Sequence, residues 1–129
     1  MLKLALAAAV FAAAPIWPTL SQPLPQPMVE VRGRAAVISL PFRGADRLSW
    51  VSATSAADAQ PFMYQALDIK LGAGPDGTDL AVFTYSAGKA GSTVLKFSLV
   101  PEGRAVIGPP ATAYTGLVVS SFQTQVSAP

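Results

Sequence analysis

The stretch LAVFTYSAGKAGSTVLKFSLV, residues 80–100, holds two runs of alternating apolar residues on either side of a Gly-Lys-Ala-Gly turn. Side chains of a β-strand point to opposite faces of the sheet in turn, so residues two apart share a face. Phe83 and Tyr85 share a face of the first run. The matching face of the second run carries Thr93, Leu95, Phe97 and Leu99. The pattern predicts a β-hairpin with one buried face and indicates an all-β domain.

Further strands are predicted on both sides of this hairpin. They cover residues 29–31, 35–40, 49–52, 63–71 and 114 to about 122, with turn-forming residues between them. Trp50 is expected in the core because of its large apolar area. The Ala-rich residues 53–60 predict one helical turn, which Pro61 ends. About five to seven strands without a long helical pattern predict an antiparallel β-sandwich.

Two of these segments predict local detail. Residues 63–71 alternate so that one side of the strand carries Met63, Gln65, Leu67, Ile69 and Leu71. At the turn of the predicted hairpin, Gly88 and Gly91 suit a tight connection with positive φ.

The first 21 residues have the pattern of a secretory signal peptide. Lys3 supplies a positive charge, and residues 4–14 form a short apolar segment. Pro15 and Pro18 interrupt this segment before it reaches the roughly 20 apolar residues that span a bilayer. We expect cleavage after Ser21 and a periplasmic or secreted protein without membrane attachment. An uncleaved N-terminal anchor is the alternative.

The rest of the chain is predicted to form one domain. Prolines at alternate positions make residues 22–28 an extended tether that cannot pair as a strand. Residues 29–122 are predicted to form the β-sandwich, and residues 123–129 a C-terminal tail. The domain has the usual size for a single core, and we expect a monomer.

The composition disfavours several classes of protein. The 129 residues include no cysteine and no histidine, and their formal net charge is +2. Disulfides and Ser-His or Cys-His catalytic triads are therefore impossible, and the commonest metal ligand is missing. The basic residues are scattered among acidic ones and form no stripe for nucleic acid. We expect a protein that is not an enzyme and that binds no cofactor, metal or nucleic acid.

Three patterns invite a chemical interpretation. Residues 72–77 match G-x-G-x-x-G, but they precede a predicted strand, whereas the dinucleotide fingerprint opens a helix. Residues 86–89 match S-x-x-K without the further motifs that complete such a site. Both are interpreted as turns. Carboxylates could also converge as a catalytic or calcium site, although solvated positions are the simpler interpretation: Asp46, Asp58, Asp68, Asp76 and Asp79.

The order of several features matches a known family. They are Val31-x-Gly33-x-x-x-Val37-Ile38-x-Leu40-Pro41, a loop followed by Trp50, the glycine-rich residues 72–77, Phe83-x-Tyr85, Gly91 and Leu95-x-Phe97. In this order and spacing the chain resembles the chagasin-like family of cysteine peptidase inhibitors over roughly residues 29–122. The resemblance implies an immunoglobulin-like β-sandwich. It also implies that three loops at one end fill the active-site cleft of a papain-like peptidase without being cut.

The resemblance places these loops at residues 42–48, 72–79 and 100–110. The expected partner-binding residues are Phe42, Arg43, Gly44, Asp46, Arg47, Gly72, Gly74, Gly77, Pro101, Glu102 and Arg104. The three glycines also suit a plain turn.

Two of the loops depart from the family pattern. The first loop normally carries Asn-Pro-Thr-Thr-Gly-Tyr, but this chain has no asparagine, and the Arg-Pro-Trp of the third loop has no counterpart at residues 100–104. The expected function is inhibition of a papain-like cysteine peptidase by an exported protein. A non-inhibitory periplasmic protein-binding or structural module on the same fold is the alternative.

Overall fold

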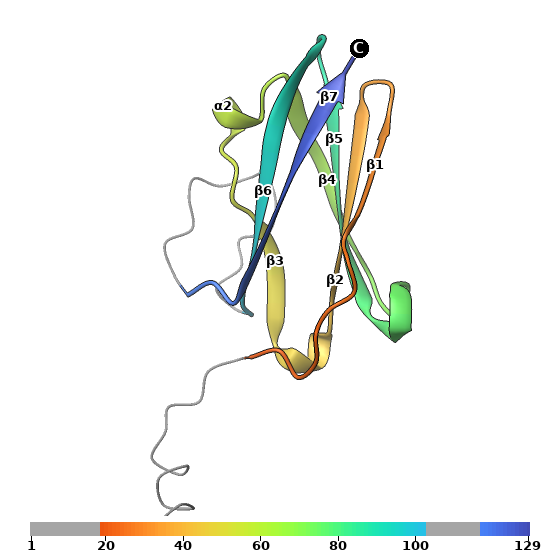
Figure 1. Ribbon diagram of the computed structural model, residues 1–129, viewed down its shortest axis with the longest axis vertical. Coiled ribbons are helices and arrows are strands. Elements are labelled where there is room, and N and C mark those ends of the chain that lie inside the picture. The colour runs from red at the N-terminus through yellow and green to blue at the C-terminus, as the bar shows by residue number, and fades with distance from the viewer. Residues whose placement is uncertain (1–18, 103–116) are drawn as a thin grey trace, which may run out of the picture.

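The computed structural model describes residues 19–102 and 117–129, which contain two antiparallel β-sheets packed face to face (Figure 1). One sheet has the strand order β1-β2-β5-β4 and the other has β3-β6-β7. The strands are β1 (Met28–Arg32), β2 (Ala35–Phe42), β3 (Leu48–Ser52), β4 (Phe62–Lys70), β5 (Asp79–Ala87), β6 (Gly91–Pro101) and β7 (Ser120–Ala128). The predicted antiparallel β-sandwich of about seven strands is confirmed.

The strand order is that of a constant-type immunoglobulin domain. With the strands lettered A to G along the chain, the two sheets become ABED and CFG. A single helical turn, α2 (Ala56–Ala59), lies within the predicted segment, and Ser55 caps it by accepting the N–H of Asp58. Within the described ranges, no helix is long and apolar enough to cross a membrane. The predicted signal peptide lies almost entirely outside those ranges.

The predicted hairpin at residues 80–100 is wrong, because β5 and β6 lie in different sheets. Both edges of β5 are already occupied, by β2 and β4, whereas β6 pairs with β3 and β7. The turn between β5 and β6 therefore carries the chain from one sheet to the other. Gly91 has a φ of +151°, and a Cβ there would lie 2.9 Å from Cγ of Pro61. Gly88 does not adopt the positive φ that was predicted.

The two faces that the alternation predicted do meet in the core. Phe83 of β5 and Phe97 of β6 face each other across the sandwich, with ring centroids 4.8 Å apart. Tyr85 packs edge-on against Phe97 at 6.4 Å. All three rings are buried, as are Leu95 and Leu99, and the sheets are thus joined by apolar contact between strands consecutive in sequence.

Trp50 occupies the predicted place in the core. Its side chain is buried on β3, and its indole Nε1–H donates a hydrogen bond to the carbonyl oxygen of Pro41 at 2.9 Å. Pro41 belongs to β2, in the opposite sheet, so this bond ties the two sheets together while it satisfies a buried donor.

The side-chain pattern predicted for β4 is wrong in its first half. The ladder with β5 shifts register between Tyr64 and Ala66, so one residue, Gln65, is inserted as a bulge. Phe62 and Tyr64 face the core before the bulge and Leu67 faces it afterwards, while Met63 is 62% exposed. A bulge adds one residue to one strand only, and it therefore exchanges the two faces of the strand.

The last strand lies further along the chain than predicted. It spans Ser120–Ala128, so residues 123–129 are not a tail and most of them complete the sheet beside β6. The predicted start at Tyr114 lies outside the described residues. The sandwich therefore extends close to the end of the chain.

Burial of Tyr85 predicts a loss of stability in alkali. Burial raises the pKa of the Tyr85 hydroxyl above its usual value of 10.0, and the hydrogen bond with Ser52 lowers it in part. The contribution of Tyr85 to stability is fully present below about pH 10 and is lost as the pH rises through the higher pKa of the folded state, because the unfolded tyrosine ionises first. The slope is at most about 1.4 kcal/mol per pH unit. Melting temperatures between about pH 8 and pH 11 should fall more for the parent chain than for Tyr85→Phe. Equal decreases would contradict the prediction.

Candidate functional site

Two of the loops expected from the sequence and the start of the third meet at one end of the sandwich, the lower end in Figure 1. The first loop, residues 43–47, joins β2 to β3 and contains the 3-10 turn η1 (Gly44–Asp46). The second, residues 71–78, joins β4 to β5 and contains η2 (Pro75–Gly77). The third begins at Glu102, after β6, and its remaining residues lie outside the described ranges, including Arg104. We call this region the loop end.

A single carboxylate joins the first two loops. Oδ2 of Asp79 accepts the backbone N–H of Gly44 at 3.0 Å, and Oδ1 accepts the N–H of Gly72 at 2.8 Å. Hydrogen bonds to a carboxylate are stronger than those to a neutral acceptor. Asp79 is the first residue of β5, and this central strand therefore holds both loops in position.

A hydrogen bond between backbone groups joins the first loop to the start of the third. The N–H of Glu102 donates to the carbonyl oxygen of Arg47 at 2.8 Å. Arg47 adopts a left-handed conformation with φ 58° and closes η1 through its own N–H bond to Gly44. Pro101 lies just before this contact, as the last residue of β6 paired with Leu48.

The second loop has a backbone that only a few residue types can adopt. Gly72, Asp76 and Gly77 all have positive φ. At Gly74 the restriction is steric, because a Cβ there would collide with Oγ1 of Thr78, and the Gly74 N–H donates to the Thr78 carbonyl oxygen at 2.8 Å. The predicted turn is confirmed, since this segment leads into β5 and does not open a helix of a nucleotide-binding unit.

Arg43 binds the chain's own N-terminal segment, residues 20–27. Its guanidinium donates to the carbonyl oxygens of Gln22, at 3.2 Å, and Pro23, at 3.4 Å. Leu20 and Leu24 of the same segment pack against the core. Of the predicted tether, residues 22–28, the first six form no strand, as predicted, but Met28 already pairs in β1. The N-terminal segment also lies against the loop end.

Two of the other expected residues contribute from inside. Phe42 is buried and supports the first loop from the core. Asp46 is half-buried, and its Oδ2 is enclosed without a hydrogen-bond partner among residues 19–102 and 117–129. Gly44, Arg47, Gly72, Gly77 and Glu102 are exposed.

Sequence reasoning missed the exposure of Leu71 and Ile69 and the hydrogen bonds of Asp79 at the loop end. Leu71 was predicted as one of the residues on a single side of a strand, but it lies just after β4, at the start of the second loop, and is 79% exposed. Ile69, two residues earlier, is 53% exposed. Asp79 was considered only as a member of a carboxylate cluster, and its separation of 35 residues from Gly44 concealed its role.

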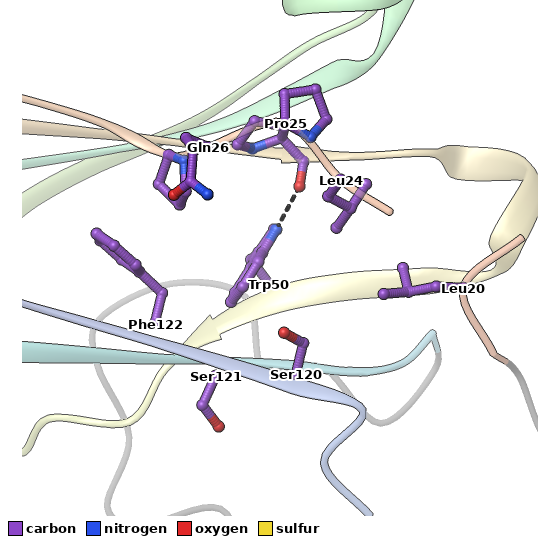
Figure 2. Close-up of a pocket in the computed structure, with 10 residues that line it drawn as sticks. Leu20, Leu24, Pro25, Gln26, Trp50, Ser120, Ser121 and Phe122 are labelled. Carbon is purple, nitrogen blue, oxygen red and sulfur yellow. Dashed lines mark hydrogen bonds between the residues drawn. The ribbon is translucent and has the colours of Figure 1, made fainter. Parts of the chain in front are cut away.

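A small pocket lies beside the loop end, between the N-terminal segment and the start of β7 (Figure 2). Leu24, Pro25, Trp50 and Phe122 line it, and its volume is about 220 Å³. Pockets for small molecules usually measure roughly 300–1,000 Å³. The size of this one does not favour a small-molecule site.

The metal, carboxylate and S-x-x-K sites considered from the sequence are not formed at the loop end by the described residues. It contains no group of three or more Asp, Glu, His or Cys residues that could hold a metal ion. Asp58 lies in α2, away from the loop end, and the S-x-x-K residues lie at the turn between β5 and β6, at the opposite end of the sandwich (Figure 1). What the loop end offers is a preordered surface of backbone and side chains.

Comparison of the chain with protein-family models, with curated proteins and with solved structures yields no match. The resemblance to the chagasin-like inhibitors therefore rests on the residues quoted from the sequence, and the function has to be argued from the loop end itself.

Proposed function

We propose that this chain is an exported, non-enzymatic inhibitor that fills the active-site cleft of a papain-like cysteine peptidase with its loop end. The observation that supports the proposal most directly is the Asp79 carboxylate, which holds the first and second loops together. The bond from Glu102 to Arg47 adds the start of the third loop. A surface that is ordered before binding loses less conformational entropy on binding, and this favours affinity.

The composition of the loop end suits a narrow cleft. Glycines at positions 44, 72 and 77 leave its exposed backbone thin. The family resemblance implies an aromatic anchor in the third loop, which is missing at residues 100–104, and Leu71 offers an exposed apolar side chain in its place. Interfaces derive most of their affinity from a few such anchors.

The direct test titrates papain-like peptidases with the purified protein and follows hydrolysis of a peptide substrate. We expect inhibition that Leu71→Ser weakens by about tenfold or more, because truncating an anchor costs roughly 1–2 kcal/mol or more. Met63→Ser is the matched control, since Met63 is also an exposed apolar residue but lies near the start of β4, at the end of that strand far from Leu71. Its inhibition should match that of the parent chain.

Two results would contradict the proposal. One is full activity of every papain-like peptidase at about 10 µM folded protein. The other is an equal effect of the two substitutions, which would move the interface away from the loop end.

A non-inhibitory protein-binding or structural module is the second candidate. The observation in its favour is Arg43, which binds carbonyl oxygens of the N-terminal segment and is not available as an anchor. This segment also covers one side of the loop end. Folded protein that slows no peptidase would favour this second function.

A further inference from the structure

Four of the seven described strands lie at the edge of a sheet: β1, β3, β4 and β7. An edge strand presents unpaired backbone groups, which proteins usually protect by short length, charged side chains, proline or a bulge. β1 and β3 have five residues each, and Glu30 and Arg32 of β1 form an ion pair. β4 carries Asp68, Lys70 and the bulge at Gln65. Three of the four edges are thus protected.

The fourth edge, β7, has none of these features. Its nine residues, SSFQTQVSA, include no charge and no proline. It pairs with β6 without a register shift over its whole length, and its outward side chains are exposed: Ser121, Gln123, Gln125 and Ser127. Such an edge is a template for another strand.

The sequence of β7 is symmetric in polarity about Thr124. Glutamines lie on both sides of it, then Phe122 and Val126, and then two serines, Ser121 and Ser127. If two such strands pair antiparallel with Thr124 opposite Thr124, each glutamine faces a glutamine, each of these serines faces a serine and Phe122 faces Val126. Directly opposed side chains contribute to the stability of a sheet, and these pairs match in polarity.

We propose that β7 pairs with β7 of a second copy of this chain, with a two-fold axis that passes between the two Thr124 residues. A two-fold interface places the same surface on both copies and must therefore be complementary to itself, as β7 is. The edge of β1 is not complementary to itself in this way, because its central residue, Glu30, would face Glu30 of the second copy and the two like charges would repel.

Apolar surface next to β7 adds to this interface. β1 contacts β7 on the same side of the sandwich (Figure 1). Its residues Val29 and Val31 point toward the inner face, where they are still 37% and 39% exposed. A second copy docked along β7 would remove part of this area from water, which favours association.

The geometry limits the assembly to two copies. Pairing uses the β7 edge of each chain and leaves the five-residue β3 strands at the two ends of the joined sheet. Because the paired strands run in opposite directions, the two loop ends point away from each other and both stay free. The dimer replaces the monomer that the sequence led us to expect, and it does not depend on the proposed function.

Two double variants with matched positions test the pairing. Gln123→Glu with Gln125→Glu places like charges opposite each other at two points of the interface, whereas Gln123→Glu with Gln125→Lys places opposite charges there. Both positions are exposed, and Lys96 of β6, which pairs with position 123, accommodates the carboxylate in both variants. Circular dichroism confirms that each variant folds.

Sedimentation equilibrium supplies the mass of the protein purified after expression of the full 129-residue chain. We expect the parent chain to be dimeric at about 100 µM, the like-charge variant to dissociate at least about tenfold more readily, and the opposite-charge variant to stay dimeric. A single-chain mass for the parent up to about 1 mM would overturn the proposal. Equal dissociation constants for the two variants would also overturn it.

Discussion

Phe97→Ala is expected to lower the free energy of unfolding by about 3–5 kcal/mol, a large part of the stability of a domain of this size. Phe97 is 1% exposed and contacts Phe83 and Tyr85 of the opposite sheet. Its truncation leaves a cavity at the point where the two sheets meet, and the surrounding strands can close it only in part. Urea denaturation followed by tryptophan fluorescence measures the change.

Val94→Ala is the control for this substitution. Val94 lies on β6 as well, but on its outer face, where it is 39% exposed, and we expect a loss below about 1 kcal/mol. Similar losses for the two substitutions would show that β6 does not bury the face that carries Phe97. A variant too unstable to purify would also be consistent with the prediction, provided that Phe97→Leu folds with a smaller loss.

The buried faces of β5 and β6 could be predicted from the sequence, but their partners could not. Alternation is a property of one strand, and it correctly identified Phe83 and Phe97 as core residues. Pairing depends on competition among all strands, and β2 and β4 together occupy both edges of β5. A glycine-rich connection of a few residues can form a hairpin or cross between sheets, and its composition alone does not distinguish the two.

The errors at β4 and β7 have separate physical causes. In β4 one inserted residue, Gln65, exchanges the two faces of the strand, and a bulge has no fixed sequence signature. In β7 the edge position leaves alternate residues in water, so the strand Ser120–Ala128 is polar enough to be interpreted as a tail. Hydrophobic patterns detect buried strands far better than exposed ones.

The place of the loops at one end was predicted, whereas the bonds that order them were not. The order of strands and turns was enough to place loops 42–48 and 72–79 and the start of the third loop, up to Glu102, at one end; the rest of loop 100–110 lies outside the described residues. The bonds depend on residues far apart in sequence, such as Asp79 with Gly44 and Glu102 with Arg47. Arg43 illustrates the same limit, because its partners lie in a segment that was predicted to be an extended tether.

Asp79→Ala is expected to release the first loop from the second while the sandwich stays folded. The substitution removes the acceptor of two hydrogen bonds, one from Gly44 and one from Gly72. Both glycines are exposed, so water replaces the carboxylate and the cost to global stability should be about 1–2 kcal/mol. Hydrogen exchange measured by NMR should be at least about tenfold faster at these two amides, because each opens locally without global unfolding.

The function of the loop end should respond more strongly than the fold to this change. Loops that are no longer held together must be ordered during binding, and we expect peptidase inhibition to weaken by about 10–100-fold. Asp68→Ala is the matched control, because Asp68 lies exposed on neighbouring β4 and its carboxylate accepts no hydrogen bond within the described part of the chain. Unchanged amide exchange in Asp79→Ala would contradict the role of the carboxylate in ordering the loops. Faster exchange with undiminished inhibition would instead show that target binding does not need the preordered pair of loops, which removes the strongest physical support for the proposed function.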